Sequence, residues 1–154
     1  MNTLDTNTKP ENLGSLIPSD IYLFEKYIKK INPKKILEWG PGVSTKIIKK
    51  LTDAEILSIE HHGLWYKKAK GFANVKHIEI KKNTSYATIA YEHGPFDMIF
   101  IDGRRRVECA IVAKQVINPG GVIMLHDKNR ENYMRPLRPH IKIIEEGEKT
   151  IVFK

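Results

Sequence analysis

The sequence predicts an α/β fold, a doubly wound and mostly parallel sheet with an antiparallel strand from a C-terminal hairpin. The first reason is that apolar, strand-like segments alternate with helix-like segments along most of the chain. The second is that residues 98–101 and 122–125 are wholly apolar, as central strands covered on both faces usually are. The third is that two further strand-like segments, 141–145 and 150–153, flank the polar segment 146–149, a pattern typical of a hairpin.

Length and composition favour one globular domain. We expect it to span residues 18–154 of the 154-residue chain, after a flexible N-terminal arm at 1–17. No apolar run is long enough to cross a bilayer, and the polar N-terminus lacks the apolar stretch of a signal peptide. Cys109 is the only cysteine, which excludes an intramolecular disulfide and a four-thiolate zinc site. We therefore expect a cytoplasmic protein with no membrane partner.

The first predicted element is an amphipathic helix at 19–31, with Ser19 as its candidate N-cap and Asn32-Pro33 at its end. Its apolar residues recur at spacings of three and four, as one buried helical face requires. The other elements follow in alternation. Strands are expected at 35–39, 55–60, 75–80, 98–101 and 122–125, helices at 44–51, 64–72 and 107–117, and residues 83–92 are ambiguous.

Ligands of such sheets bind at the carboxyl ends of the strands, so the residues after each strand are candidates. The first strand runs into the turn Glu38-Trp39-Gly40-Pro41-Gly42-Val43-Ser44-Thr45. The two glycines allow a tight turn and a close backbone approach, and the next helix offers N–H groups at its start. A plain Gly-Pro-Gly turn is the alternative interpretation.

A nucleoside ligand is indicated by Glu60, which ends the second strand 18 residues after Gly42. An acid at this distance can accept hydrogen bonds from both ribose hydroxyls. A dinucleotide site would need a third glycine where this chain has Thr45. Glu38 would repel a pyrophosphate but can hold an ammonium group. Both features favour S-adenosylmethionine, which has an amino group and no phosphate, over NAD.

Four motifs in order resemble those of class I S-adenosylmethionine-dependent methyltransferases, which have a Rossmann-like fold. They are Glu38–Thr45, Ser58–His61 with Trp65-Tyr66, Ile101–Arg106, and Gly120–Asp127. The resemblance implies that Glu38 holds the methionine amino group, Glu60 the ribose hydroxyls, and that His61 lies near the adenine. The cofactor-binding residues that it implies are Glu38, Gly40, Gly42, Ser44, Thr45, Glu60, His61, Asn83 and Asp102.

The catalytic candidates are Asp102, His126 and Asp127, at the ends of the fourth and fifth strands. Asp102 could be a general base, a metal ligand or a cofactor contact. His126 could deprotonate a hydroxyl, or it could be a hydrogen-bonded strand-end histidine. Asp102 and Asp127, with His126 or Asn129, could hold Mg²⁺ or Mn²⁺. Some metal-dependent O-methyltransferases have two aspartates at similar strand ends followed by an asparagine, where this chain has Lys128, so the expectation is against a metal but keeps one open.

The run Arg104-Arg105-Arg106 opens the helix after the fourth strand, where cations are unfavourable because the helix dipole is positive there. This favours a carboxylate or phosphate on the acceptor as their partner, although one arginine could instead pair with Glu108 or Asp127. The predicted substrate-binding residues are Arg104, Arg106, Arg130 and Tyr133, with Arg135 nearby.

The sequence therefore predicts O-methylation of a small molecule or sugar hydroxyl. The chain has no room for a separate acceptor domain, so the helix at 19–31 or a second copy in a homo-oligomer would cover the site. The net charge of +8 keeps a nucleic-acid (RNA) methyltransferase open, although no RNA-binding module is evident. A non-catalytic S-adenosylmethionine-binding domain and another S-adenosylmethionine-consuming reaction also stay open.

Overall fold

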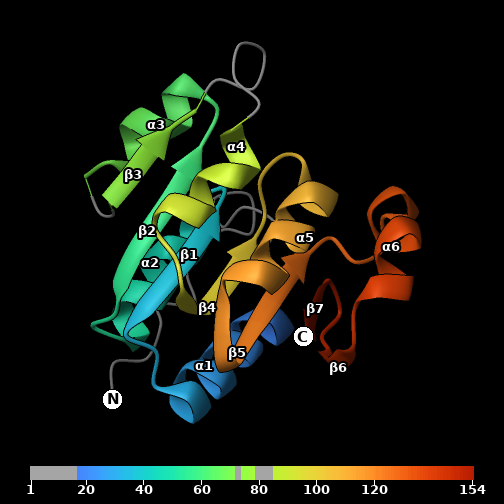
Figure 1. The fold of residues 1–154 in the computed structure, drawn as a ribbon. Helices are drawn as coiled ribbons and strands as arrows, with labels where there is room; N and C mark the ends of the chain where they lie inside the picture. The colour runs from blue at the N-terminus through green and yellow to red at the C-terminus, as the bar shows by residue number, and fades with distance from the viewer. Residues whose placement is uncertain (1–16, 72–73, 79–84) are drawn as a thin grey trace.

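The computed structural model describes residues 17–71, 74–78 and 85–154, which form a sheet between two layers of helices (Figure 1). The strands are β1 Lys35–Trp39, β2 Glu55–Glu60, β3 Asn74–His77, β4 Phe96–Ile101, β5 Ile117–His126, β6 Ile143–Glu146 and β7 Thr150–Phe153. The helices are α1 Pro18–Ile31, α2 Val43–Leu51, α3 Gly63–Ala69, α4 Ser85–Thr88, α5 Arg106–Val116 and α6 Glu131–Leu137, with 3-10 helices η2 Ile89–Glu92 and η3 Arg138–His140.

The sheet has the strand order β3-β2-β1-β4-β5-β7-β6 within the described residues. Neighbouring strands from β3 to β5 pair in parallel, while β7 is antiparallel to both β5 and β6. The predicted fold class, including the C-terminal antiparallel strand, is confirmed. Because β1, β2, β4 and β5 run the same way, their carboxyl ends meet at one edge of the sheet.

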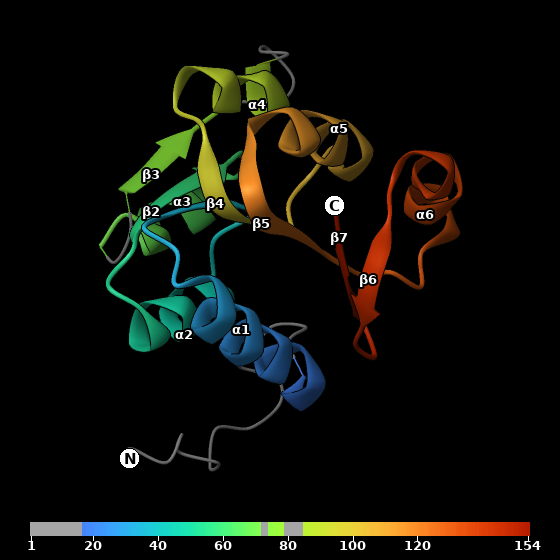
Figure 2. The same cartoon turned by 60° about the horizontal axis from the view of Figure 1, so that its bottom comes forward.

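Helices α1 and α2 cover one face of the sheet, and α4 and α5 cover the other (Figure 2). The two faces carry separate hydrophobic cores. Strand β1 supplies both, because successive side chains of a strand point to opposite faces. Ile36 packs in the core beneath α1 and α2, whereas Leu37 and Trp39 pack in the core beneath α4, α5 and α6. None of the described helices combines the length and the apolar character needed to cross a membrane.

The start of α1 differs from the prediction. Its first residue is Pro18 and its N-cap is Ile17, because proline suits the first helical position and needs no N–H partner. Asp20 closes the turn by accepting the Ile17 N–H over 3.3 Å. Ser19 is therefore not the N-cap, and its hydroxyl accepts the N–H of Glu148 over 3.2 Å.

Two further elements differ from the prediction. Helix α6 was not expected from the sequence, because Pro136 lies within it and most of its residues are polar. It is held by Met134 and Leu137, which are buried in the core beneath α5. Strand β5 begins at Ile117, well before the apolar segment that predicts it. The predicted arm, apart from Ile17, lies outside the described residues, and so does Asn83.

Candidate functional site

The turn after β1 approaches the end of β4 so closely that it requires glycine. Gly40 has φ +85°, and a Cβ there would lie 2.5 Å from the carbonyl oxygen of Asp102. The Asp102 N–H also donates to the carbonyl of Trp39 over 2.8 Å. Gly42 differs, because a Cβ there would meet no heavy atom within 4 Å. The turn at Gly40 thus packs closely against the end of β4, while Gly42 borders open space at the start of α2.

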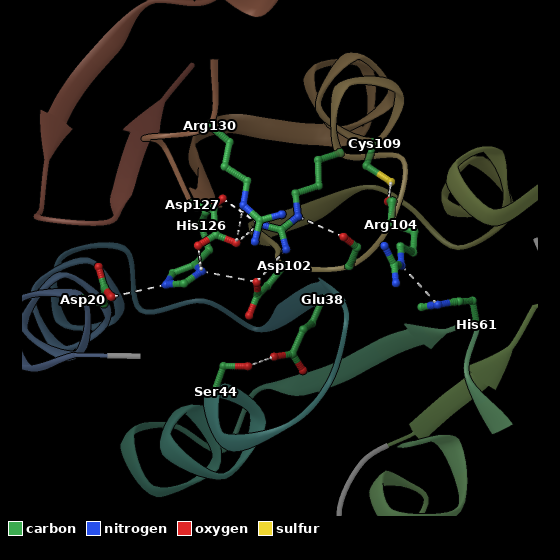
Figure 3. A network of polar contacts seen from close by, with 12 residues as sticks. Asp20, Glu38, Ser44, His61, Asp102, Arg104, Cys109, His126, Asp127 and Arg130 are labelled. Carbon is green, nitrogen blue, oxygen red and sulfur yellow. Dashed lines mark hydrogen bonds and ion pairs between the residues drawn. The ribbon is translucent and has the colours of Figure 1, made fainter. Parts of the chain in front are cut away.

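Glu38 is fully buried beneath this turn. Its carboxylate accepts a hydrogen bond from the hydroxyl of Ser44 (Figure 3). It also accepts from the hydroxyls of Thr45 and Ser58, the latter over 3.1 Å. Burial raises the pKa of Glu38 to about 7, with a contribution from the charge of Asp102, although the three hydroxyls oppose the shift. The predicted cofactor residues Glu38, Ser44 and Thr45 therefore form one hydrogen-bonded group, which links α2 to β1 and, through Ser58, to β2.

Glu60 ends β2 at the same edge and has only 4% of its surface exposed. Its Oε1 accepts the backbone N–H groups of His61 and His62, each over 2.9 Å. The side chain of Arg104, which follows β4, donates from Nε to His61 Nε2 over 3.4 Å (Figure 3). Burial lowers the pKa of His61, which suits a neutral ring that accepts this bond. The ends of β2 and β4 are thus linked through side chains.

His126 ends β5 and is fully buried. Its Nδ1 lies 3.3 Å from Asp102 Oδ1 and 3.4 Å from Asp127 Oδ1, and its Nε2 lies 3.4 Å from Asp20 Oδ2 (Figure 3). Burial lowers the pKa of His126, but the hydrogen bonds and charges of these carboxylates outweigh it and raise the pKa to about 9. At neutral pH the ring is therefore an enclosed cation.

Arg106, the first residue of α5, is a second enclosed cation with 8% of its surface exposed. Its guanidinium lies 3.1 Å from Asp102 Oδ1 and 2.9 Å from Asp127 Oδ2. It also donates to the carbonyls of Gly103 over 2.9 Å and His126 over 2.8 Å. Partners within the chain thus hold the guanidinium of Arg106, which we expected to bind a substrate. The structure shows the alternative interpretation, in which an arginine of this run pairs with Asp127.

The other predicted substrate residues lie near or at the surface. The ring of Tyr133, in α6, faces two guanidiniums, with 5.1 Å from its centroid to Arg106 Cζ and 5.8 Å to Arg130 Cζ. The Arg130 side chain is 59% exposed, and its Nε lies 3.8 Å from Asp127 Oδ2. The exposed residues also include Arg104, Arg105, Asn129 and Arg135.

No protein-family model matches the sequence, and no curated protein matches it. Solved structures do match. A methyltransferase-like protein from Silicibacter pomeroyi has a TM-score of 0.74 at 15% identity, over 90% of this chain and 86% of that one. The O-methyltransferase from Bacillus cereus, in complex with SAH, has a TM-score of 0.67 at 15% identity, over 93% and 84%. The O-methyltransferase TomG from Streptomyces achromogenes, in complex with SAM, has a TM-score of 0.63 at 16% identity, over 90% and 80%.

This chain has the methyltransferase fold. Within that fold, the carboxyl edge of the sheet carries Glu38, Glu60 and Asp102, three acids that the sequence predicts as cofactor contacts. Their contact with a cofactor stays a prediction. The structure brings Glu38 and Asp102 near each other, and it joins the ends of β2 and β4 through His61 and Arg104.

A resident divalent metal does not fit this site. Asp102, His126 and Asp127 do bring ligand-type atoms within 4.8 Å of one another. However, Arg106 contacts both carboxylates and His126 carries a positive charge between them. A divalent cation would have to displace these internal cations, at a large electrostatic cost.

Asp20 belongs to this group of charges, although the sequence gives no sign of it. It is fully buried on α1, and its Oδ2 faces His126 Nε2. Burial raises the pKa of Asp20, but hydrogen bonds with His126, Thr150 and the backbone of Ile17 outweigh it and lower the pKa. An acid in the first turn of a helix is expected for capping alone, so only the packing of α1 reveals its second partner.

Proposed function

We propose that this chain is an S-adenosylmethionine-dependent methyltransferase that methylates a hydroxyl group of a small molecule. The observation that carries the proposal is the carboxyl edge of the sheet, where Gly42 borders open space and the buried acids Glu38 and Glu60 lie on adjacent parallel strands. The matched O-methyltransferases from B. cereus and S. achromogenes were solved in complex with SAH and SAM. The same fold therefore supports the same cofactor here.

Each acid has a separate part in cofactor binding. Glu60 would accept hydrogen bonds from the ribose hydroxyls, with its carboxylate oriented by the N–H groups of His61 and His62. Glu38 would attract the amino group of the methionine moiety from beneath the turn. Gly42, together with the start of α2, would let the backbone approach the ligand closely.

A bound cofactor would supply a methyl group on a sulfonium, whose carbon an acceptor oxygen would attack in line with the departing sulfur. Asp102, at the end of β4 with its side chain 21% exposed, is the group that takes the hydroxyl proton. On methyl transfer, the Asp102 carboxylate would hold the proton that the acceptor hydroxyl loses. His126 is unsuited to this step, because it is enclosed and already protonated at neutral pH.

The positive charge that a metal would bring is supplied here by Arg106 and His126. We therefore expect binding and methyl transfer to persist in a metal chelator. The exposed guanidiniums of Arg104 and Arg130 would contact an anionic group on the acceptor, since Arg106 is held internally. Loss of methyl transfer in the chelator, restored by Mg²⁺, would contradict the metal-independent site.

The cofactor is tested by calorimetric titration of S-adenosylmethionine, with NAD and ATP as competing candidates. Glu60→Gln keeps an oxygen for the backbone N–H groups but loses the charge, and it should weaken binding by about 10- to 100-fold. Glu55→Gln, on the exposed opposite end of the same strand, is the matched control and should bind as the parent does. Absent binding, or equal binding of NAD, would refute the proposed cofactor.

The reaction is tested next, by measuring S-adenosylhomocysteine release with a panel of small hydroxyl compounds. Release that requires one class of acceptor would identify the substrate. A protein that binds the cofactor tightly and releases no product with hydroxyl, amine or RNA acceptors would instead be a cofactor-binding domain without this activity.

A further inference from the structure

Asp20 is a buried acid that the proposed reaction does not use. It lies on α1, in the helical layer beneath the sheet, and none of its surface is exposed. A buried carboxylate costs free energy unless a cation faces it, and Asp20 faces the imidazole of His126 at 3.4 Å. The position of this acid therefore depends on His126, and the reverse also holds.

The contacts continue from His126 into the carboxyl edge of the sheet. On the side away from Asp20, the ring faces Asp102 at 3.3 Å and Asp127 at 3.4 Å. Arg106 contacts the same two acids from α5 and donates to the carbonyl of His126. Figure 3 shows the resulting line of side chains, from Asp20 through His126 to Asp102.

We propose that Asp20 is a positioning residue of the cofactor site, which acts through His126 on Asp102. This inference rests on the proposed function, because it assumes that Asp102 meets the bound cofactor. With Asp20 present, both ring nitrogens of His126 carry protons that face carboxylates, and Asp102 is held between two cations. Without Asp20, the Nε2 proton would face no anion in a buried place, so the ring would lose it and its hold on Asp102 would weaken.

A double-mutant cycle isolates this indirect action. The affinity for S-adenosylmethionine is measured for the parent, Asp20→Asn, His126→Gln and the double variant. Asp20→Asn alone should weaken binding by about 3- to 30-fold, and it should cause no further loss in the His126→Gln background. Glu25→Gln, an exposed acid on the same helix, is the control and should have no effect. An equal loss in both backgrounds, or no loss in either, would overturn the proposal.

The link between Asp20 and His126 has its own measurement, which needs no cofactor. The imidazole signals of His126, assigned by their absence in His126→Gln, are followed by NMR as the pH is raised. They should titrate at a lower pH in Asp20→Asn than in the parent, and an unchanged titration would refute the link. If Asp20→Asn does not fold, Asp102→Asn tests the other side of the ring, with the same expected direction.

These two readouts separate failure of the inference from failure of the proposed function. If the parent protein does not bind S-adenosylmethionine, the proposed function is wrong whatever the titration of His126 shows. If the parent binds and the Asp20→Asn affinity is unchanged, the proposed cofactor stands and the positioning role is wrong.

Discussion

Glu38 lies one residue before the end of β1 and Glu60 ends the adjacent parallel strand β2, yet the fold holds the two acids in different ways. Glu60 accepts backbone N–H groups at the end of β2, whereas Glu38 is enclosed and accepts three side-chain hydroxyls. Burial raises the pKa of Glu38 to about 7, so this carboxyl is partly protonated at neutral pH. An ammonium group brought near it would favour the ionised form and expel the proton.

Cofactor binding should therefore release protons near pH 7. We expect about half a proton per bound S-adenosylmethionine at this pH, because the pKa of Glu38 lies close to it. Calorimetry in buffers with different heats of ionisation measures the release directly. Glu38→Gln has no proton to give, so its binding heat should not depend on the buffer. A parent protein with buffer-independent heats would show that the ligand's cation does not reach Glu38.

Gly40 and Gly42 allow the effect of an added side chain to be tested in two environments. Gly40→Ala should destabilise the fold by about 2–4 kcal/mol, because a Cβ at positive φ would clash with the backbone of Asp102. Gly42→Val should leave the unfolding midpoint nearly unchanged and weaken cofactor binding at least about tenfold, since its side chain would enter open space. Thermal unfolding and calorimetry check the two effects. Equal destabilisation by both variants would mean that the space beside Gly42 is not a binding space.

The start of α5 shows how a helix tolerates three arginines at its positive end. The Nε of Arg105 lies 3.1 Å from Oε2 of Glu108, and the guanidinium of Arg106 contacts Asp102 and Asp127. These carboxylates offset the unfavourable interaction of the arginines with the helix dipole. The unusual position of these arginines was therefore a true signal of anionic partners. The partners of two of them are residues of the chain itself, and Arg104 and Arg130 remain for a ligand.

Replacing the two paired arginines should have unequal consequences. Arg106→Met leaves the half-buried Asp102 beside His126 alone, and the half-buried Asp127 beside His126 and the exposed Arg130, and should cost about 3–5 kcal/mol of folding free energy. Arg105→Met breaks a pair at the surface and should cost less than about 1 kcal/mol. Denaturant unfolding measures both variants. Similar small costs for the two would mean that Arg106 does not hold the acids together.

The enclosed charges around His126 link the stability of the fold to pH. The folded pKa of His126, about 9, lies above the ordinary value of 6.5, so protonation stabilises the native state. This stabilisation is complete below pH 6.5 and is lost as the pH rises through 9. Its magnitude is up to about 3 kcal/mol.

Unfolding free energies at pH 6.5 and pH 9.5 should therefore differ more in the parent than in His126→Gln. Taking the difference between the two proteins removes the contributions of other titrating groups, Glu38 among them. If the two proteins lose the same stability over this interval, His126 is not the charged group that we describe.

Much of the fold could be predicted from local patterns. Strands β4 and β5 are marked by apolar runs and the turn at Gly40 by its glycines, because burial and φ constrain those residues locally. Helix α6 was missed, since Pro136 disrupts its pattern and only two of its residues, Met134 and Leu137, are buried. Local patterns identify elements best where many consecutive residues share one environment.

The candidate site was predictable only in part, for a related reason. The strand-end acids follow from the topology of parallel sheets, which places Glu38, Glu60 and Asp102 at one edge. Asp20 was missed because its partner, His126, lies far away in the sequence and in another layer. Whether a charged residue faces a ligand or an internal partner depends on packing, as Arg106 shows.

The network around His126 also has a consequence for the order of folding. It joins α1 to the ends of β4 and β5, so its contacts close very long loops of chain. Such closures carry a large entropic cost, which is offset only once the sheet has formed and α1 has docked against it. The site should therefore be assembled late during refolding. During refolding, cofactor binding would then recover later than the helices and strands, because only the fully folded molecule would bind the cofactor.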